Sequence, residues 1–244
     1  MKAFIVHAHP EPNSFTAAMK QLAVETLRAA GDDVRVSDLY AMKFNPVASD
    51  ADFRKRSNNN YLVYALEQRH ADGTNTLAGD IAGEIEKVVW ADLIIFSFPV
   101  FWFSVPAIMK GWIDRVLISG RFYGGTRFYD EGGLKGKRAL LALTLGGQEH
   151  MFEANGIHGP LEDMLRPLLR GTLGYVGFDV LPPFVAWHVP YISAEARQEI
   201  LNKYRRHLRA LHEQRPLRFP SLSDFDSALR PLAVPVNTHR FLKE

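Results

Sequence analysis

The chain has 244 residues, of which 47% are hydrophobic and 23% charged, with a formal net charge of +2 and no cysteine. This length suits one large domain, or one domain with a terminal arm, and the composition is typical of a soluble globular protein. The small net charge gives no reason to expect nucleic acid as a partner, and the absence of cysteine excludes disulfides, thiolate metal sites and a cysteine nucleophile.

In the first half of the chain, strands and helices alternate in the predicted structure. The predicted elements are a strand at residues 2–6, a helix at 15–27, a strand at 34–36 and a helix at 81–89. Asn13 or Ser14 can cap the first helix, and Gly31 ends it. Residues 45–77 lack strong periodicity, which predicts a long connection of the kind that often carries function. The first residues carry too short an apolar run for a signal peptide.

The second half of the chain continues the alternation. The predicted elements are a strand at residues 93–98, a helix at 108–117, a strand at 138–144, a helix at 161–169, a strand at 180–187 and a helix at 193–211. Pro106 stands near a first helical turn, where a missing N–H costs least, and Pro167 is expected to kink its helix. Prolines and serines interrupt the uncharged run at 93–109, so no membrane-spanning helix is predicted.

This order of elements predicts an α/β fold. Strands that alternate with helices form a parallel sheet with helices on both faces and right-handed crossovers. We expect five strands in a domain at residues 1–212, followed by an irregular, proline-rich C-terminal arm at residues 213–244.

Three unusual segments follow three of the predicted strands. They are HAHPEPNSF after the first strand, PVFWFSVP after the third and TLGGQEHMFEANGIHG after the fourth. Ligands of open parallel sheets bind beyond the carboxyl ends of the strands. The three segments should therefore meet at one end of the sheet and form a candidate site there.

The first two segments offer an anion site and an aromatic wall. The first runs into a helix N-terminus, where free N–H groups, the hydroxyls of Ser14 and Thr16, and His9 could hold a phosphate; the alternative is a plain capped loop. In the second, the rings of residues 101–103 could stack on a planar aromatic ligand, and the alternative is a hydrophobic corner packed on a helix.

The third segment offers backbone donors and a histidine. Thr144 ends a strand, and Gly146 and Gly147 let the backbone approach a ligand closely. His158 is flanked by glycines, and both a catalytic and a structural interpretation stay open. The combined features suit a flavin better than a sugar. Carboxylates do not gather with ligand spacing, so no metal site is predicted.

Five segments, in order, closely resemble the NAD(P)H:quinone oxidoreductases of the DT-diaphorase type, which have the flavodoxin-like fold. They are AHPEPNSFTAAM, SDLYAMKFNPVAS, ADLIIFSFPVFWFSVPAIMKGWIDRV, TLGGQEHMFEANGIHG and GFDVLPP, and the resemblance spans most of residues 3–211. It implies a homodimer with one FAD per active site at the subunit interface, and the absence of cysteine suits a cytoplasmic location. It also implies two-electron, ping-pong hydride transfer from NAD(P)H through flavin N5 to quinones or similar flat electron acceptors.

The resemblance also assigns residues. The implied cofactor-binding residues are His9, Phe15, Thr16, Val100, Phe101, Trp102, Phe103, Thr144, Leu145, Gly146, Gly147 and Arg197. The implied substrate-binding residues are Trp102, Phe103, Tyr123, Gly125, Tyr175 and His158. His158 and Phe152 occupy the positions at which the family stabilises negative charge on the flavin.

Three positions depart from the family pattern. Phe152 stands where the family has a tyrosine, so this chain lacks one hydrogen-bond donor, a loss that can cost a few kcal/mol. Gly125 replaces a second active-site tyrosine, which should widen the mouth of the pocket. Thr16 replaces the usual asparagine.

Two other functions stay open. One is an azoreductase or nitroreductase that uses FMN. The other is a flavodoxin-like ancillary subunit that regulates a membrane transporter. The choice between NADH and NADPH is also open, because no charged residue is assigned to the ribose 2′ position. The C-terminal arm is a candidate for contacts at the dimer interface.

Overall fold

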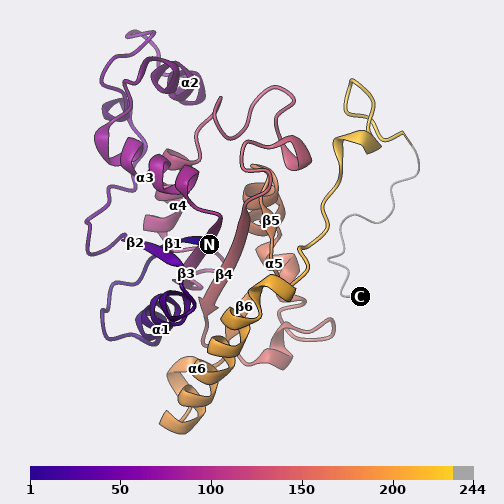
Figure 1. The fold of residues 1–244 in the computed structure, drawn as a ribbon. Coiled ribbons are helices and arrows are strands. Elements are labelled where there is room, and N and C mark those ends of the chain that lie inside the picture. Colours follow the sequence, from indigo (N-terminus) through magenta and orange to yellow (C-terminus); the bar gives the residue numbers. More distant parts are fainter. Residues whose placement is uncertain (233–244) are drawn as a thin grey trace.

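The computed structural model describes residues 1–232, and one parallel sheet organises them (Figure 1). The strands are β1 (Lys2–His7), β2 (Asp33–Asp38), β3 (Leu93–Pro99), β4 (Arg138–Thr144), β5 (Asp179–Val180) and β6 (Phe184–Ala186). The sheet order is β2-β1-β3-β4-β5, with β6 also paired to β4, and every pairing is parallel. This is the order of flavodoxin-like sheets, so the predicted fold class is confirmed.

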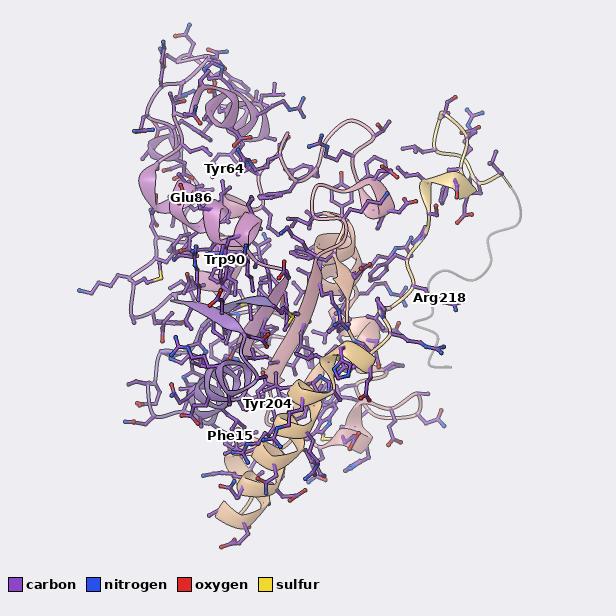
Figure 2. The ribbon with its side chains drawn as sticks, in the orientation of Figure 1. Phe15, Tyr64, Glu86, Trp90, Tyr204 and Arg218 are labelled. Carbon is purple, nitrogen blue, oxygen red and sulfur yellow. The ribbon has the colours of Figure 1, made fainter. Side chains whose placement is uncertain are left out.

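Helices cover both faces of the sheet. They are α1 (Phe15–Ala29), α2 (Tyr64–Thr74), α3 (Gly79–Trp90), α4 (Ala107–Val116), α5 (Leu161–Leu168) and α6 (Ala194–Arg209). Successive strand residues point to opposite faces, so Ile5 packs with α1 and α6 whereas Phe4 packs with α3 and α4. Figure 2 shows Phe15 of α1 near Tyr204 of α6, and both belong to the first of these two layers.

The predicted fifth strand is two short strands. Both pair with β4: Arg138 lies opposite Asp179, and Ala142 lies opposite Phe184. Pro182 and Pro183 stand between the two strands. Proline has no N–H to donate, so the hydrogen-bond ladder with β4 is interrupted at the two prolines and resumes at Phe184.

The connection at residues 45–77 contains a helix, α2, that the sequence pattern did not predict. The buried face of this helix makes its contacts through polar side chains. Glu67 accepts hydrogen bonds from the backbone N–H groups of Ser57 and Asn58, at 2.8 and 2.9 Å. Gln68 is buried, and its amide bonds the backbone of Asp114 and Ser119. Because polar residues make these contacts, the sequence of α2 has no apolar stripe from which a helix could be predicted.

Pro167 lies inside α5, as predicted, and the helix changes type shortly after it. Residues Leu169–Gly174 form a π-helical turn instead of continuing the α-helix. The hydroxyl of Thr172 donates to the carbonyl of Pro167 at 3.1 Å. Proline removes one backbone hydrogen bond of the helix, and the wider π-helical turn, supported by the Thr172 hydroxyl, accommodates this loss.

The arm packs on the domain as far as the structure describes it. Its stretch around Arg218 (Figure 2) runs beside the sheet, where the N–H of Leu217 donates to the carbonyl of Val180 at 2.7 Å. Phe219 packs against Gly174. Residues 233–244, the rest of the predicted arm, lie outside the described residues.

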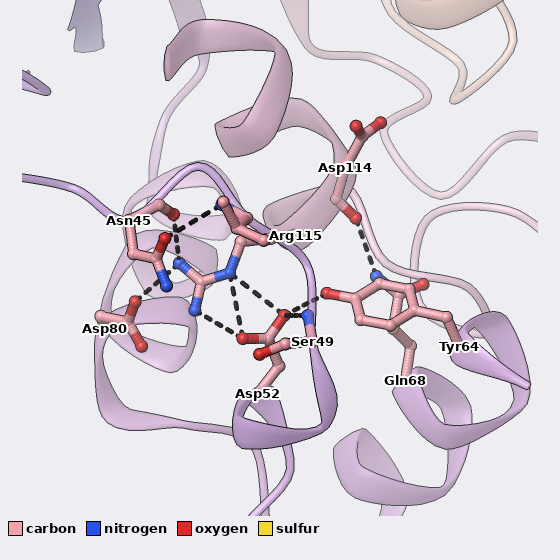
Figure 3. A network of polar contacts seen from close by, with 9 residues as sticks. Asn45, Ser49, Asp52, Tyr64, Gln68, Asp80, Asp114 and Arg115 are labelled. Atoms are coloured by element: carbon pink, nitrogen blue, oxygen red, sulfur yellow. Dashed lines mark hydrogen bonds and ion pairs between the residues drawn. The ribbon is translucent and has the colours of Figure 1, made fainter. Parts of the chain in front are cut away.

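A buried ion pair joins α4 to the connection that follows β2 (Figure 3). The Arg115 guanidinium contacts the Asp52 carboxylate at 2.8 Å, and these side chains are only 3% and 1% exposed. Arg115 also contacts Asp80 and the carbonyl of Asn45, and Tyr64 donates to Asp52. The Arg115 guanidinium therefore binds groups that hold the fold together: Asp52, Asp80 and the carbonyl of Asn45.

Candidate active site

The carboxyl ends of β1, β3 and β4 bring the three predicted loops together. Thr144 lies opposite Pro99 in the sheet, and its carbonyl accepts the N–H of Val100 at 2.8 Å. The hydroxyls of Thr16 and Thr144 are buried and 2.9 Å apart. The start of α1 is thus bonded to the end of β4.

The loop before α1 is preorganised. Ser14 caps the helix and accepts the N–H of Ala17 at 3.1 Å, as one of the two predicted caps. His9 Nδ1 lies 3.0 Å from the backbone nitrogen of Glu11 and 3.1 Å from its carbonyl oxygen, so the backbone of Glu11 fixes the orientation of the ring. Burial lowers the pKa of His9 despite opposing contributions from Glu11. The imidazole is thereby held near the helix N-terminus, where anions bind best.

The aromatic segment after β3 is a tight turn. Phe101 and Ser104 exchange two backbone hydrogen bonds of 3.0 Å. Trp102 and Phe103, at the two central positions, have φ values of 50° and 57°, in the left-handed region. This conformation costs about 1 kcal/mol or more for each non-glycine residue. Despite that cost, Trp102 is 95% exposed, so packing within the chain does not explain the turn.

The loop after β4 is held by the segment that follows β6. The N–H of Leu145 donates to Ala186, and the N–H of Val189 donates to Leu145, at 3.1 and 3.2 Å. A side chain on Gly147 would lie 2.5 Å from the ring of Phe152, so only glycine fits there. The backbone of residues 145–147 is thereby fixed beside the aromatic turn.

His158 is packed between two aromatic rings. Its ring centroid lies 5.4 Å from that of Phe103 and 4.9 Å from that of Phe152. Phe152 in turn contacts Trp187 at 5.3 Å and is buried. Flanking glycines therefore do not leave His158 loosely held, because residues far away in the sequence fix it.

Tyr123, Gly125 and Tyr175 are not near these residues in one chain. Tyr123 and Gly125 precede β4, and Tyr175 precedes β5, so all three lie at the amino end of the sheet. The three loops of the candidate site follow their strands and lie at the carboxyl end. Tyr123 and Tyr175 contact each other, with ring centroids 5.6 Å apart. A single chain therefore does not place the predicted substrate-binding residues around one cleft.

Arg197 lies at the carboxyl end of the sheet, after β6. It is half-buried in the first turn of α6, and its Nε donates to the carbonyl of Val189 at 3.3 Å. The guanidinium is thereby anchored next to the segment that supports the loop after β4.

Sequence reasoning missed three side chains at this end. Trp187 supports Phe152, His188 Nδ1 lies 2.7 Å from the carbonyl of Gly146, and Tyr191 is 73% exposed beside His188. They follow β6 as the predicted loops follow β1, β3 and β4. The same rule on the carboxyl ends of strands would have found them.

His7 lies buried at the end of β1, with its Nδ1 3.1 Å from the hydroxyl of Ser97. No pattern in the sequence singled out this residue. Burial lowers its pKa to about 4. The unfolded chain binds this proton below about pH 6.5, whereas the folded chain does not, so protonation favours unfolding as the pH falls. From pH 7.5 to pH 5 we expect His7 to remove about 2 kcal/mol of stability.

Urea unfolding at several pH values tests this expectation. His7→Gln keeps a group that can bond Ser97 but cannot take up the proton. Its stability should change less between pH 7.5 and pH 5 than that of the wild type. Equal losses in the two proteins would contradict the assignment.

Comparison with known proteins gives the family. The family model described as "Flavodoxin-like fold" matches residues 1–210. The ribosyldihydronicotinamide dehydrogenase (quinone) of Mus musculus is 43% identical over 217 residues, which are 88% of this chain and 94% of the mouse protein. The chain belongs to the NAD(P)H:quinone oxidoreductase family. It is an oxidoreductase of the NAD(P)H dehydrogenase (quinone) type.

Two further members extend the similarity along the chain. The NAD(P)H dehydrogenase (quinone) 1 of Rattus norvegicus is 41% identical over 228 residues, 92% of this chain and 82% of its own. The crystal structure of a putative quinone reductase from Klebsiella pneumoniae superposes with a TM-score of 0.92 at 36% identity, covering 98% of this chain and 99% of that chain. Among the described residues, no helix is both long and apolar enough to cross a membrane.

Proposed function

We propose that this protein is an FAD-dependent NAD(P)H:quinone oxidoreductase that works by two-electron, ping-pong hydride transfer. The observation that carries the proposal is the Trp102–Phe103 turn, which is strained and exposed beside a fixed glycine loop and His158. A flat ring system placed on this turn would bury the exposed indole, and the strained backbone would then serve to hold the aromatic side chains in position for that ligand. The names of the relatives support a quinone as the electron acceptor.

The residues present fit a flavin. The N-terminus of α1, with Ser14, Thr16 and His9, suits a phosphate group. The backbone N–H groups of Gly146 and Gly147 are positioned to donate to the polar edge of a ring, and Arg197 would face an adenosine. The flavin, when bound, supplies the capacity to accept a hydride at N5 and pass it on. The protein holds and orients the reactants and tunes the charge around them.

We infer that the working form is a homodimer in which each cleft is completed by the other copy. This inference rests on Tyr123 and Tyr175, which lie at the amino end of the sheet, away from the cleft of their own chain. In a second copy these rings could cover the exposed Trp102. The same assembly would bring Gly125 to the mouth of the cleft, where the missing side chain would admit bulkier acceptors.

The purified protein tests the proposal directly. We expect a yellow protein that releases FAD on boiling, elutes as a dimer and oxidises NADH or NADPH with menadione. Release of FMN, with reduction of an azo dye in place of menadione, would instead support an azoreductase. A colourless protein that binds no FAD and shows no turnover would reject the proposal and leave a role as an ancillary subunit.

Phe152→Tyr should preserve or raise the rate of flavin reduction. The substitution returns a hydroxyl donor to a position beside His158, and the ring keeps its contacts with Trp187. Stopped-flow reduction by NADPH measures the rate. A large loss of rate would show that the pocket is packed around the smaller ring and has no room for a hydroxyl.

A further inference from the structure

The C-terminal arm is bonded to one carboxylate in the loop that precedes β4. Asp130 accepts the Ser221 hydroxyl on Oδ2 at 2.6 Å and the Leu222 N–H on Oδ1 at 2.9 Å. Both oxygens of the carboxylate thus bind the arm. We call this pair of hydrogen bonds the Asp130 latch.

Asp130 belongs to a turn that carries aromatic residues. Tyr129 has a φ of 49°, in the left-handed region, and its N–H donates to the carbonyl of Tyr175 at 2.9 Å. Phe128 stacks on Tyr175 at 5.6 Å with the rings nearly parallel, and Tyr175 contacts Tyr123. Together with Tyr129 these rings form one aromatic cluster, and Asp130 is the next residue along the chain.

The arm touches the aromatic cluster from a second side. Phe219 packs on Gly174, the residue before Tyr175, so closely that a side chain there would lie 2.9 Å from its ring. Upstream, Leu217 is bonded to Val180 of β5. The arm is therefore fixed to the sheet first and reaches Asp130 from a defined position.

An open pocket of about 160 Å³ lies beside the latch, and both the loop and the arm line it with residues that include Phe128, Tyr129, Leu222 and Phe225. Burial raises the pKa of Asp130, but the hydrogen bonds from Ser221 and Leu222 outweigh it and hold the pKa below its usual value. At neutral pH the latch is a charged acceptor with two donors, which is stronger than a neutral hydrogen bond.

We propose that Asp130 is a positioning residue through which the C-terminal arm sets the arrangement of the aromatic cluster, and thereby the affinity for the electron acceptor. The proposal rests on the proposed function, since the cluster reaches a cleft only in the homodimer. Without the latch, the strained turn at Tyr129 loses its support from the arm. The rings that would cover the acceptor then sample more conformations, so the acceptor binds less well while the chemistry at the flavin is unchanged.

Hydrogen exchange of the full-length, flavin-loaded protein tests the positioning step. Asp130→Ala should speed exchange about tenfold in peptides that contain Leu222 and in peptides that contain Tyr129, and Asp130→Asn should do so less because it keeps one acceptor oxygen. Glu131→Ala is the matched control, since the side chain of the neighbouring Glu131 pairs with Lys135 at the surface and not with the arm as far as the structure describes it. It should leave both regions unchanged.

Steady-state kinetics tests the consequence. For Asp130→Ala we expect a severalfold higher KM for menadione, with kcat and the FAD content within about twofold of the wild type. Faster exchange in the arm alone would overturn the proposal, because the loop would then hold its shape without the arm. Faster exchange in both regions with an unchanged KM would overturn the link to acceptor binding. A wild type without quinone turnover would reject the proposed function, and the exchange data would still decide whether the latch orders the loop.

Discussion

Arg115→Ala should lower the free energy of unfolding by about 3–5 kcal/mol, the usual cost of removing one partner of a buried ion pair. The substitution leaves the Asp52 carboxylate almost fully buried, with Tyr64 as its remaining side-chain donor in place of a guanidinium. Asn45 also loses a donor to its carbonyl. The connection that contains α2 would then lose its main link to α4.

Urea denaturation of both proteins measures this difference. Lys110→Ala is the matched control, because Lys110 lies on the same helix and pairs with Asp114 at the surface, where both side chains are well exposed. Surface pairs of this kind contribute at most about 1 kcal/mol. A loss of less than about 1 kcal/mol for Arg115→Ala would mean that water reaches Asp52 and that the ion pair is not buried in solution.

His158→Ala should slow flavin reduction by NADPH about a hundredfold to a thousandfold, the cost of removing one donor from a site where negative charge develops. Phe152 cannot substitute for the imidazole, since it has no donor. The substitution also removes a ring that lies between Phe103 and Phe152, yet the proposed phosphate contacts are elsewhere. FAD should therefore remain bound.

Stopped-flow absorbance at the flavin band gives the reduction rate, and the ratio of flavin to protein absorbance gives the occupancy. His150→Ala serves as the control because His150 is exposed in the same loop. Both variants should keep their flavin, and only His158→Ala should be slow. A wild-type reduction rate in His158→Ala would reject its catalytic role, and loss of FAD would assign it to binding instead.

The sheet and its loops could be predicted because β1, β3 and β4 carry clear apolar runs. Once the strands are parallel, the loops after β1, β3 and β4 must meet at one end, and the Thr16–Thr144 contact bears this out. Helix α2 could not be predicted, because buried polar side chains hold it in place instead of an apolar stripe. Helix α2 is anchored by Glu67 and Gln68, which resemble surface residues in the sequence.

The candidate site was predictable only in part. The family resemblance assigns Tyr123 and Tyr175 to a substrate pocket but does not say which copy of the chain supplies them. Only the strand order shows that they lie at the other end of the sheet. In the same way, the glycines near His158 in GIHG give no sign of what packs on its ring, whereas Phe103 and Phe152 hold it through tertiary contacts.

The interrupted strand beside β4 also bears on self-association. Exposed sheet edges present free N–H groups that can template aggregation with another molecule. At this edge Pro182 and Pro183 have no N–H, and the carbonyl of Val180 is already taken by Leu217. Strand addition is blunted there, so copies of this chain are kept from joining their sheets edge to edge on that side. An ordered dimer would then have to use other surfaces, such as those that carry the aromatic rings.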